Sequence, residues 1–174
     1  PPQVVQEEKG HSDSGLGVAR LSLQAGARIA IAGRSQPKMD AAAGSLGNPA
    51  NLVPCAADIA DAGKVQDLVK QVTERFGQID ILVCNAGTNV RNRSLETLTP
   101  ADWDKMIATN LTGAFNLVHY VLPSMRARES GLVIQICSIS GKRASVLGGA
   151  GYSASKFGQS ALGMVTSVEA MRVA

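Results

Sequence analysis

No stretch of this chain stays apolar over the roughly 20 residues that a helix needs to cross a bilayer. Residues 1–8 lack the basic region and the apolar run of a signal peptide. Internal repeats and low-complexity linkers are also missing. The sequence therefore predicts a cytoplasmic protein without a membrane partner, and its 174 residues suit one domain.

Cysteine and blocks of like charge are scarce as well. Cys55, Cys84 and Cys137 share no metal-ligand spacing, so we expect each to be a small buried hydrophobe in a reducing compartment. This pattern argues against a metal site and a disulfide framework. The 17 Lys and Arg and the 14 Asp and Glu give a net charge of +3 and alternate in sign along the chain. Although the pI is about 9.0, no nucleic-acid partner is predicted.

What the chain does contain is an alternation of short apolar runs and helical patterns, with 45% hydrophobic residues to form a core. Buried parallel strands are predicted where β-branched residues concentrate, at 28–32, 51–55, 79–84 and 132–137. Helical spacing is found at 17–25, 38–46, 65–76 after the expected cap Asp61, 102–125 and 152–171. This order predicts the α/β class, as a three-layer α/β/α Rossmann fold with a doubly wound parallel sheet.

The two ends fit this fold least well. The only candidate for the central first strand is residues 3–7, where burying Gln and Glu without partners costs about 2 kcal/mol or more each. At the other end, residues 171–174 would only begin a sixth strand. We therefore expect residues 1–174 to form a single Rossmann-fold domain with a weak first strand, without strands six and seven, and truncated at the C-terminus.

A glycine-rich turn precedes the first clear helix. It contains Gly10, Gly15 and Gly17, with Ser14 and Leu16 between them. Glycines let the backbone turn sharply and approach a pyrophosphate, whose charge is met by the amides at the helix N-terminus. A Gly-Leu-Gly sequence taken alone is more often only a turn.

Arg34 and Ser35 follow the strand predicted at 28–32. In a sheet of this type that position faces an adenosine ribose, where a carboxylate would accept from a 2′-hydroxyl and an Arg would receive a 2′-phosphate. Because Arg34 is present and a carboxylate is not, NADP is favoured and NAD remains open. The alternative is that Arg34 is a solvated loop cation.

Two further strand ends point into the same crevice. Asp58, followed by Ile59, is placed to accept a hydrogen bond from an adenine amine. Asn85, Ala86 and Gly87 are small residues that would let a ribose approach. Asp58 could equally cap a helix, and Asn85 could simply close a turn.

Tyr152 and Lys156 form the most informative pair. Their spacing of four places the phenol and the ammonium on one helix face, about one turn apart. A nearby ammonium favours the phenolate form and makes the phenol a usable acid and base for a carbonyl or a hydroxyl. Ser138, just past a predicted strand, can hydrogen-bond the reacting oxygen. Asn110 completes the polar set, because an Asn within a helix needs a reason.

Together these motifs resemble the classical short-chain dehydrogenase/reductase (SDR) family from about Gly10 to the end of the chain. The resemblance implies a Rossmann fold and an oxidoreductase that uses NAD(P)(H). It implies that Tyr152 is the catalytic acid/base, Ser138 orients the substrate oxygen and Lys156 holds the nicotinamide ribose. Asn110 would anchor a water in a proton relay. The resemblance also implies a homodimer or homotetramer packed through the helices at 102–125 and 152–171.

Some positions depart from the family pattern. The family's turn reads Thr-Gly-x-x-x-Gly-x-Gly, whereas Gly10 stands here at the threonine and His11 at the first glycine. Cys84 replaces a common Asn. Ser140 lies close to Ser138, but the family's Ser-x-x-Gly fits only when Ser138 is the catalytic serine.

Two hypotheses of different classes follow. The first is an NADP(H)-dependent oxidoreductase that interconverts a carbonyl and a secondary alcohol, with a 3-oxoacyl thioester, a sugar or another small alcohol as substrate. The alternative is a truncated, catalytically impaired chain of the same fold that acts only in oligomer association.

Overall fold

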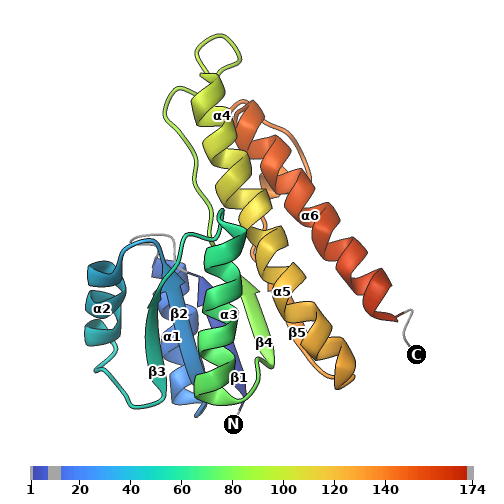
Figure 1. Ribbon diagram of the computed structural model, residues 1–174. Coiled ribbons are helices and arrows are strands. Elements are labelled where there is room, and N and C mark those ends of the chain that lie inside the picture. The colour runs from blue at the N-terminus through green and yellow to red at the C-terminus, as the bar shows by residue number, and fades with distance from the viewer. Residues whose placement is uncertain (1, 8–12, 172–174) are drawn as a thin grey trace.

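The computed structural model describes residues 2–7 and 13–171, which form one sheet with helices on both faces (Figure 1). The strands are β1 (Gln3–Glu7), β2 (Arg28–Gly33), β3 (Leu52–Ala56), β4 (Ile81–Cys84) and β5 (Leu132–Gln135). The helices are α1 (Asp13–Gln24), α2 (Gln36–Ser45), α3 (Ala62–Phe76), α4 (Pro100–Ile107), α5 (Gly113–Ala127) and α6 (Ala150–Met171), with a π-helical turn η1 (Ala108–Thr112) and a 3-10 turn η2 (Ile139–Gly141). The predicted α/β class is confirmed.

The strands are parallel and lie in the order β3-β2-β1-β4-β5. The chain moves outward from β1 to β3 and then crosses back to β4 on the other side of β1. Val5 accordingly pairs with Ala30 of β2 on one side and with Leu82 of β4 on the other. The carboxyl ends of β1 and β4 therefore form the switch point at which doubly wound sheets bind their ligands.

Two apolar clusters cover the two faces of the sheet. Along β2, Ile29 and Ile31 point into one cluster and Ala30 and Ala32 into the other, and all four are fully buried. Such burial on both faces explains why β2 reads as a continuous apolar run. The first cluster packs under α1 and α2, and the second under α3 and α5.

β1 takes the central position expected for residues 3–7. Its Val4 is buried at 3% exposure between β2 and β4. The free-energy cost expected for burying Gln and Glu in this strand falls on side chains that lie outside the described ones.

The helix ends differ from the prediction in two places. α1 begins at Asp13, ahead of the expected start at residue 17, because a helical backbone accepts glycine at a cost of about 1 kcal/mol. The helix expected at 102–125 starts earlier, after Thr99, whose hydroxyl accepts from the Asp102 amide, and η1 interrupts it. Asp61 caps α3 as predicted, with its carboxylate accepting from the Lys64 amide at 3.1 Å.

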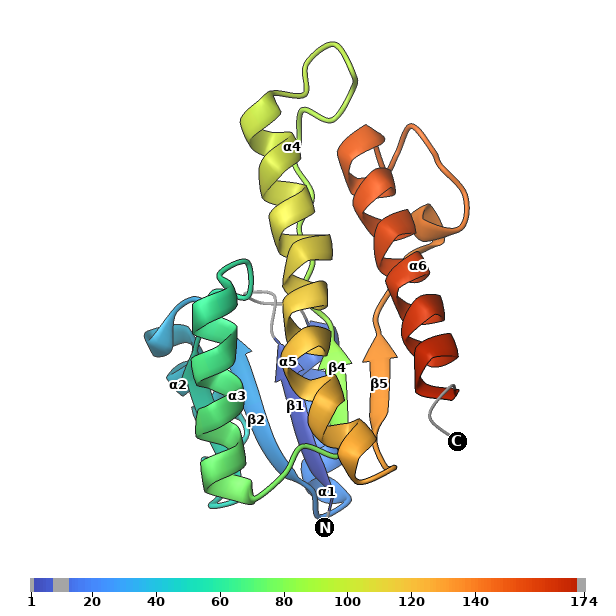
Figure 2. The same cartoon turned by 45° about the vertical axis from the view of Figure 1, so that its right-hand side comes forward.

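β5 is an edge strand of the described sheet. Leu132 is 51% exposed and Ile134 and Ile136 are 36% exposed on one face, while α6 packs near β5 and α5 packs near β4 (Figure 2). Cys137 follows this strand and is exposed as well, so the prediction that every cysteine is buried is wrong for Cys137. No described element covers that face. Cys55 and Cys84 lie in the sheet interior and are buried as expected.

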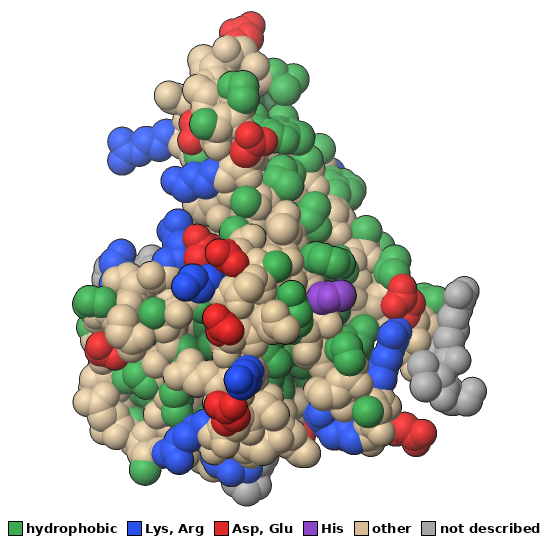
Figure 3. Space-filling view, in the orientation of Figure 1, with side chains coloured by type: hydrophobic (Ala, Val, Ile, Leu, Met, Phe, Trp, Pro, Cys, Tyr) green, Lys and Arg blue, Asp and Glu red, His purple; other side chains and the backbone are tan. Residues whose placement is uncertain are grey.

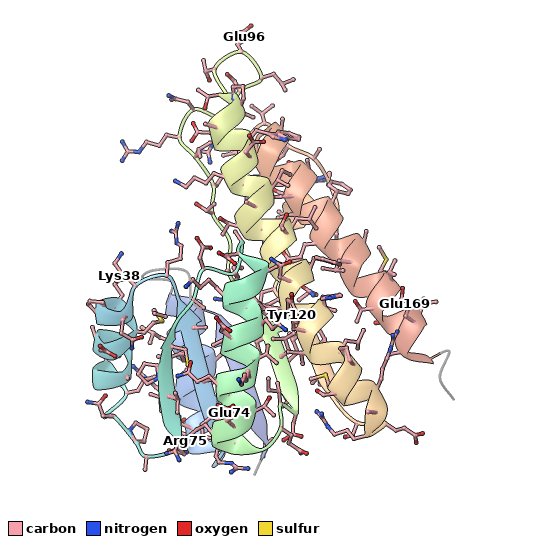
Figure 4. The ribbon with its side chains drawn as sticks, in the orientation of Figure 1. Lys38, Glu74, Arg75, Glu96, Tyr120 and Glu169 are labelled. Atoms are coloured by element: carbon pink, nitrogen blue, oxygen red, sulfur yellow. The ribbon has the colours of Figure 1, made fainter. Side chains whose placement is uncertain are left out.

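The outer face of α5 and α6 carries much apolar surface, visible as green along the right-hand edge of Figure 3. A salt bridge between Arg126 and Glu169, 3.1 Å long, joins the two helices (Glu169 is labelled in Figure 4). Val118, Val121 and Met125 are buried within the chain and contribute nothing to this face. The exposed large apolar side chains of α5 and α6, which we call the outer apolar face, are Phe115, Phe157, Met164, Val165 and Val168.

Candidate active site

The polar residues singled out from the sequence gather where β4 and β5 end and α6 begins. Tyr152 and Lys156 lie one turn apart on α6, with the Lys156 Nζ 6.0 Å from the centroid of the Tyr152 ring. Lys156 is only 3% exposed. Its ammonium donates to the Ile136 carbonyl oxygen at 3.0 Å and to Gln159 Oε1 at 2.6 Å. The predicted juxtaposition of a phenol and an ammonium on one helix face is therefore present.

Asn110 lies in the π turn η1 and is fully buried. Its Oδ1 accepts from the Thr88 amide at 2.6 Å, and its Nδ2 donates to the Thr88 carbonyl at 2.9 Å and to Ser155 Oγ at 2.9 Å. Single π turns occur often at functional sites because the extra residue redirects a side chain. The unfavourable Asn within a helix thus has its reason: it connects the loop after β4 to α6.

Gly87 brings bare backbone close to these groups. A Cβ built on it would lie 3.3 Å from Lys156 Nζ and 3.7 Å from Asn110 Oδ1. Gly87 is buried, as are Asn85 and Ala86, which precede it after β4. The missing side chain therefore lets the ammonium and the amide lie against the backbone of the segment after β4.

A cavity of about 430 Å³ opens beside Tyr152. Ser140 and Gly148 line it, and a Cβ at Gly148 would come within 2.7 Å of Ser140 Oγ. Asn89 donates to the Gly148 carbonyl at 3.1 Å and holds the cavity wall in place. Its remaining lining residues are Ile139, Arg143, Ser145 and Leu147.

Ser138 is half-buried at the start of η2, where its Oγ accepts from the Ser140 amide at 3.2 Å. It precedes the lining residues of the cavity, whereas Ser140 is one of them and is 5% exposed. Both serines therefore stand close to the opening beside Tyr152.

The residues expected to face an adenosine lie at the ends of β2 and β3. Arg34 is exposed, and Ser35 precedes α2 without a side-chain capping bond. Asp58 accepts from the Ala60 amide at 3.1 Å, so its carboxylate closes a turn while remaining exposed. Ile59 is buried in the core at 3% exposure and its carbonyl accepts from Asn116, so its side chain faces the interior.

The glycine-rich segment is described in part, since Gly10 lies outside the described residues. Ser14, Gly15, Leu16 and Gly17 belong to the first turns of α1, which follows β1. The N-terminus of α1, where the helix dipole is positive, lies at the switch point of the sheet. A Cβ at Gly17 would meet nothing within 4 Å.

Sequence reasoning missed three polar residues that support the site. Ser155 bonds Asn110, Gln159 bonds Lys156, and Gln135 bonds Gln159. Gln159 lies one turn beyond Lys156, a spacing that would have indicated contact. The sequence gives no comparable signal for Gln135, because its contact depends on how β5 meets α6.

Two kinds of feature are absent from residues 2–7 and 13–171. They hold no group of three or more His, Cys, Asp or Glu that could bind a metal ion. They also hold no helix that is long and apolar enough to traverse a bilayer.

The sheet order defines a Rossmann-type fold, and Tyr152, Lys156 and Asn110 lie together at the carboxyl ends of its strands. A family model described as short chain dehydrogenase matches residues 11–173. The chain therefore belongs to the short-chain dehydrogenase family, which confirms the resemblance noted in its sequence.

Characterised relatives share about a third of the sequence. Levodione reductase of Leifsonia aquatica is 33% identical over 162 residues, which cover 90% of this chain and 60% of that protein. The 3-oxoacyl-[acyl-carrier-protein] reductase of Thermotoga maritima is 32% identical over 148 residues, covering 83% and 59%. The chain thus spans about 60% of the length of these two proteins.

Solved structures match nearly the whole chain. A metagenomic short-chain oxidoreductase in complex with NADP superposes with a TM-score of 0.90 at 28% identity, over 99% of this chain and 77% of the other. The alcohol dehydrogenase of the archaeon Thermococcus sibiricus, complexed with 5-hydroxy-NADP, gives a TM-score of 0.87 at 26% identity, over 97% and 71%.

Proposed function

We propose that this chain carries the cofactor-binding and proton-transfer residues of an NADP(H)-dependent oxidoreductase that interconverts a carbonyl and a secondary alcohol. The observation that carries the proposal is the buried Lys156 ammonium one helical turn from Tyr152, against the backbone of Gly87. A lysine this buried needs a strong reason, because desolvating a charge is costly unless it is paired.

Each residue of the group has a defined task. Tyr152 donates or accepts the proton at the reacting oxygen, and the positive charge of Lys156 stabilises the phenolate that remains after donation. Ser138 hydrogen-bonds the reacting oxygen and orients it. Asn110 fixes the loop after β4 against α6 and anchors a water for proton relay.

The cofactor fits the residues at the strand ends, and when bound it supplies the hydride. Asn85, Ala86 and Gly87 are small residues beside which its ribose would lie, together with Tyr152 and Lys156. The helix start at Ser14, Gly15, Leu16 and Gly17, with Gly10 before it, would hold the pyrophosphate.

The adenosine end favours NADP over NAD. Arg34 is exposed after β2, where it can pair with a 2′-phosphate, and Ser35 lies next to it. Asp58 would receive the adenine amine, with Ile59 contributing its backbone. Two of the structural neighbours described above were determined with NADP or a derivative of it.

The substrate is a small carbonyl compound or its alcohol. The cavity beside Tyr152 has the volume of a modest organic molecule, about 430 Å³. The names of relatives include a levodione reductase and a 3-oxoacyl-[acyl-carrier-protein] reductase. A 3-oxoacyl thioester and levodione are therefore the substrates to test first.

Cofactor binding gives the direct test. Addition of NADPH should change the fluorescence of Trp103 or raise the melting temperature, since a ligand that binds only the folded state stabilises it. Tyr152→Phe should abolish turnover and leave NADPH affinity nearly unchanged, because only the proton donor is lost. Lys156→Ala should weaken both. A flat NADPH response would refute the proposal, and equal loss of binding in the two variants would refute the division of roles.

Association without catalysis is the second candidate, and the outer apolar face favours it. Large exposed apolar patches usually mark an interface, and this one would pair α5 and α6 with their symmetry mates in a homodimer or homotetramer. A protein that assembles yet ignores NADPH would have this second function only.

A further inference from the structure

The Lys156 ammonium is held from behind by an amide side chain. Gln159 lies three residues further along α6, is fully buried, and places Oε1 2.6 Å from Lys156 Nζ. That short distance is typical of a hydrogen bond with a charged donor. Gln159 therefore contributes to where the ammonium stands.

Gln159 is itself anchored to two strands. Its Nε2 donates to Gln135 Oε1 of β5 at 3.0 Å and to the carbonyl of Cys84, the last residue of β4, at 3.4 Å. Gln159 thereby fixes the Lys156 ammonium relative to the carboxyl ends of β4 and β5. Without these anchors the long lysine side chain would have many rotamers open to it.

The charge of Lys156 dictates the orientation of both amides. An ammonium has only donors, so Gln159 must turn its oxygen toward it and its nitrogen toward Gln135. Gln135 must then present its own oxygen, and its Nε2 is left buried without a hydrogen-bond partner among the described residues. Leaving a buried donor unpaired destabilises the folded state, because its hydration is lost without replacement. The arrangement gives the Lys156 ammonium an acceptor and leaves the Gln135 amide nitrogen without one among the described residues.

The helix also leaves room for this arrangement. A Cβ on Gly163 would lie 3.2 Å from Gln135 Cγ, so a glycine at this turn of α6 lets the Gln135 side chain reach Gln159. The glycine lowers helix propensity relative to alanine at this position.

We propose that Gln159 is a positioning residue that holds the Lys156 ammonium against the ends of β4 and β5, ready for the ribose and for Tyr152. Its consequence for catalysis rests on the proposed function. The hydrogen bond between Gln159 and Lys156 exists in the protein without cofactor and can be measured there.

Nuclear magnetic resonance of lysine ammonium groups in the ¹⁵N-labelled protein reads this bond directly. The other described lysines are exposed and exchange their protons rapidly, so Lys156 should give a protected signal, which Lys156→Arg removes and thereby assigns. Gln159→Met keeps the length of the side chain and removes the acceptor. In Gln159→Met we expect the ammonium protons of Lys156 to exchange about tenfold faster than in the unsubstituted protein, because the loss of one hydrogen bond to a charged group has an effect of this order.

Two matched variants separate positioning from packing. Gln159→Glu retains an acceptor oxygen and should keep the signal within about twofold of the unsubstituted protein. Thr166→Val changes another buried polar residue of α6, whose hydroxyl donates only to the Leu162 carbonyl of the same helix, and should leave the signal unchanged. An unchanged signal in Gln159→Met, or an equal loss in Thr166→Val, would overturn the proposal.

Folding is checked by circular dichroism. If Gln159→Met does not fold, the unsubstituted protein still decides: a nuclear Overhauser contact between the Lys156 ammonium and the Gln159 side chain supports the proposal, and its absence overturns it. In the folded variant, NADPH affinity should fall about tenfold while Gln159→Glu restores it. If the unsubstituted protein shows the protected signal and binds no NADPH, the positioning stands and the proposed function fails.

Discussion

Asn110 clamps Thr88 from both sides, accepting from its amide at 2.6 Å and donating to its carbonyl at 2.9 Å. An amide side chain that bonds both backbone groups of one residue replaces the partners that a strand would supply. The loop after β4 is thereby fixed directly above the candidate site. This relationship makes Asn110 a structural as well as a functional residue.

Replacing Asn110 with Leu should therefore destabilise the fold before any chemistry is considered. The side chain is fully buried, and its loss leaves the amide and the carbonyl of Thr88 without this partner. We expect the free energy of unfolding in urea to fall by about 2 to 4 kcal/mol. Asn92→Leu, at an exposed position of the same loop, is the control and should change it by less than about 0.5 kcal/mol. Similar values for both variants would contradict the clamp.

Arg34→Ala should lower NADPH affinity selectively. Loss of a charge-assisted contact with a 2′-phosphate costs about 2 to 4 kcal/mol, while NADH, which lacks that phosphate, should bind nearly as before. Calorimetric titration of both cofactors measures the difference. Arg20→Ala removes another exposed arginine, on α1, and should affect neither cofactor. A matched loss for NADPH and NADH in Arg34→Ala would make Arg34 structural.

The two serines near the cavity can be separated by activity. Ser138→Ala should reduce NADPH oxidation with a 3-oxoacyl thioester by about a hundredfold or more, because the hydrogen bond to the reacting oxygen is lost. Ser140→Ala should retain most of the activity. The opposite ranking would transfer the role to Ser140, whose side chain lines the cavity.

The three cysteines should differ sharply toward iodoacetamide. Cys137 is exposed and should be alkylated in the native protein at pH 8, whereas Cys55 and Cys84 are buried. Burial also raises the pKa of the Cys55 thiol to about 11, so little nucleophilic thiolate forms there. Mass spectrometry of the digested protein should find one modified cysteine before unfolding and three in urea. Early modification of Cys55 would contradict the burial.

The same pKa affects stability at high pH. Between pH 9 and pH 11 the Cys55 thiol loses its proton in the unfolded chain but keeps it in the folded protein. Deprotonation therefore stabilises the unfolded state, and the free energy of unfolding falls as pH rises. Cys55→Ala should remove this part of the decline.

Val165→Lys should disrupt self-association through the outer apolar face. Val165 is 53% exposed, so the substitution has little cost within one chain, yet it would bury a charge in the proposed seam. Sedimentation at micromolar concentration should show a dimer or tetramer that shifts to monomer in the variant. Lys70→Ala, at an exposed position of α3, should leave the assembly unchanged. A monomeric unsubstituted protein would rule out the seam.

The sequence was informative where local pattern and burial coincide. β2 lies close to its predicted range because apolar side chains on both faces need a buried strand, and Asp61 was recognisable because its carboxylate caps α3 locally. Tyr152 and Lys156 could be paired from helical spacing alone.

Other features depend on contacts between distant segments. The π turn around Asn110 is stabilised by Thr88 and Ser155, which lie 22 and 45 residues away. Cys137 was expected in the core because cysteine is commonly buried, but it follows the edge strand β5 and is exposed. Residue type alone carries no information about either.

The π turn η1 also makes chain length, rather than composition, the sensitive property of this helix. A π turn holds one residue more than an α turn, so shortening residues 108–112 by one would let a regular helix form and rotate α4 against α5 by about 100°. Trp103 and Met106, whose side chains lie against Gly151 of α6, would then move away from that helix, and Asn110 would lose its hold on the loop. Substitutions on the exposed side of α4 should be well tolerated there, and single-residue deletions should not.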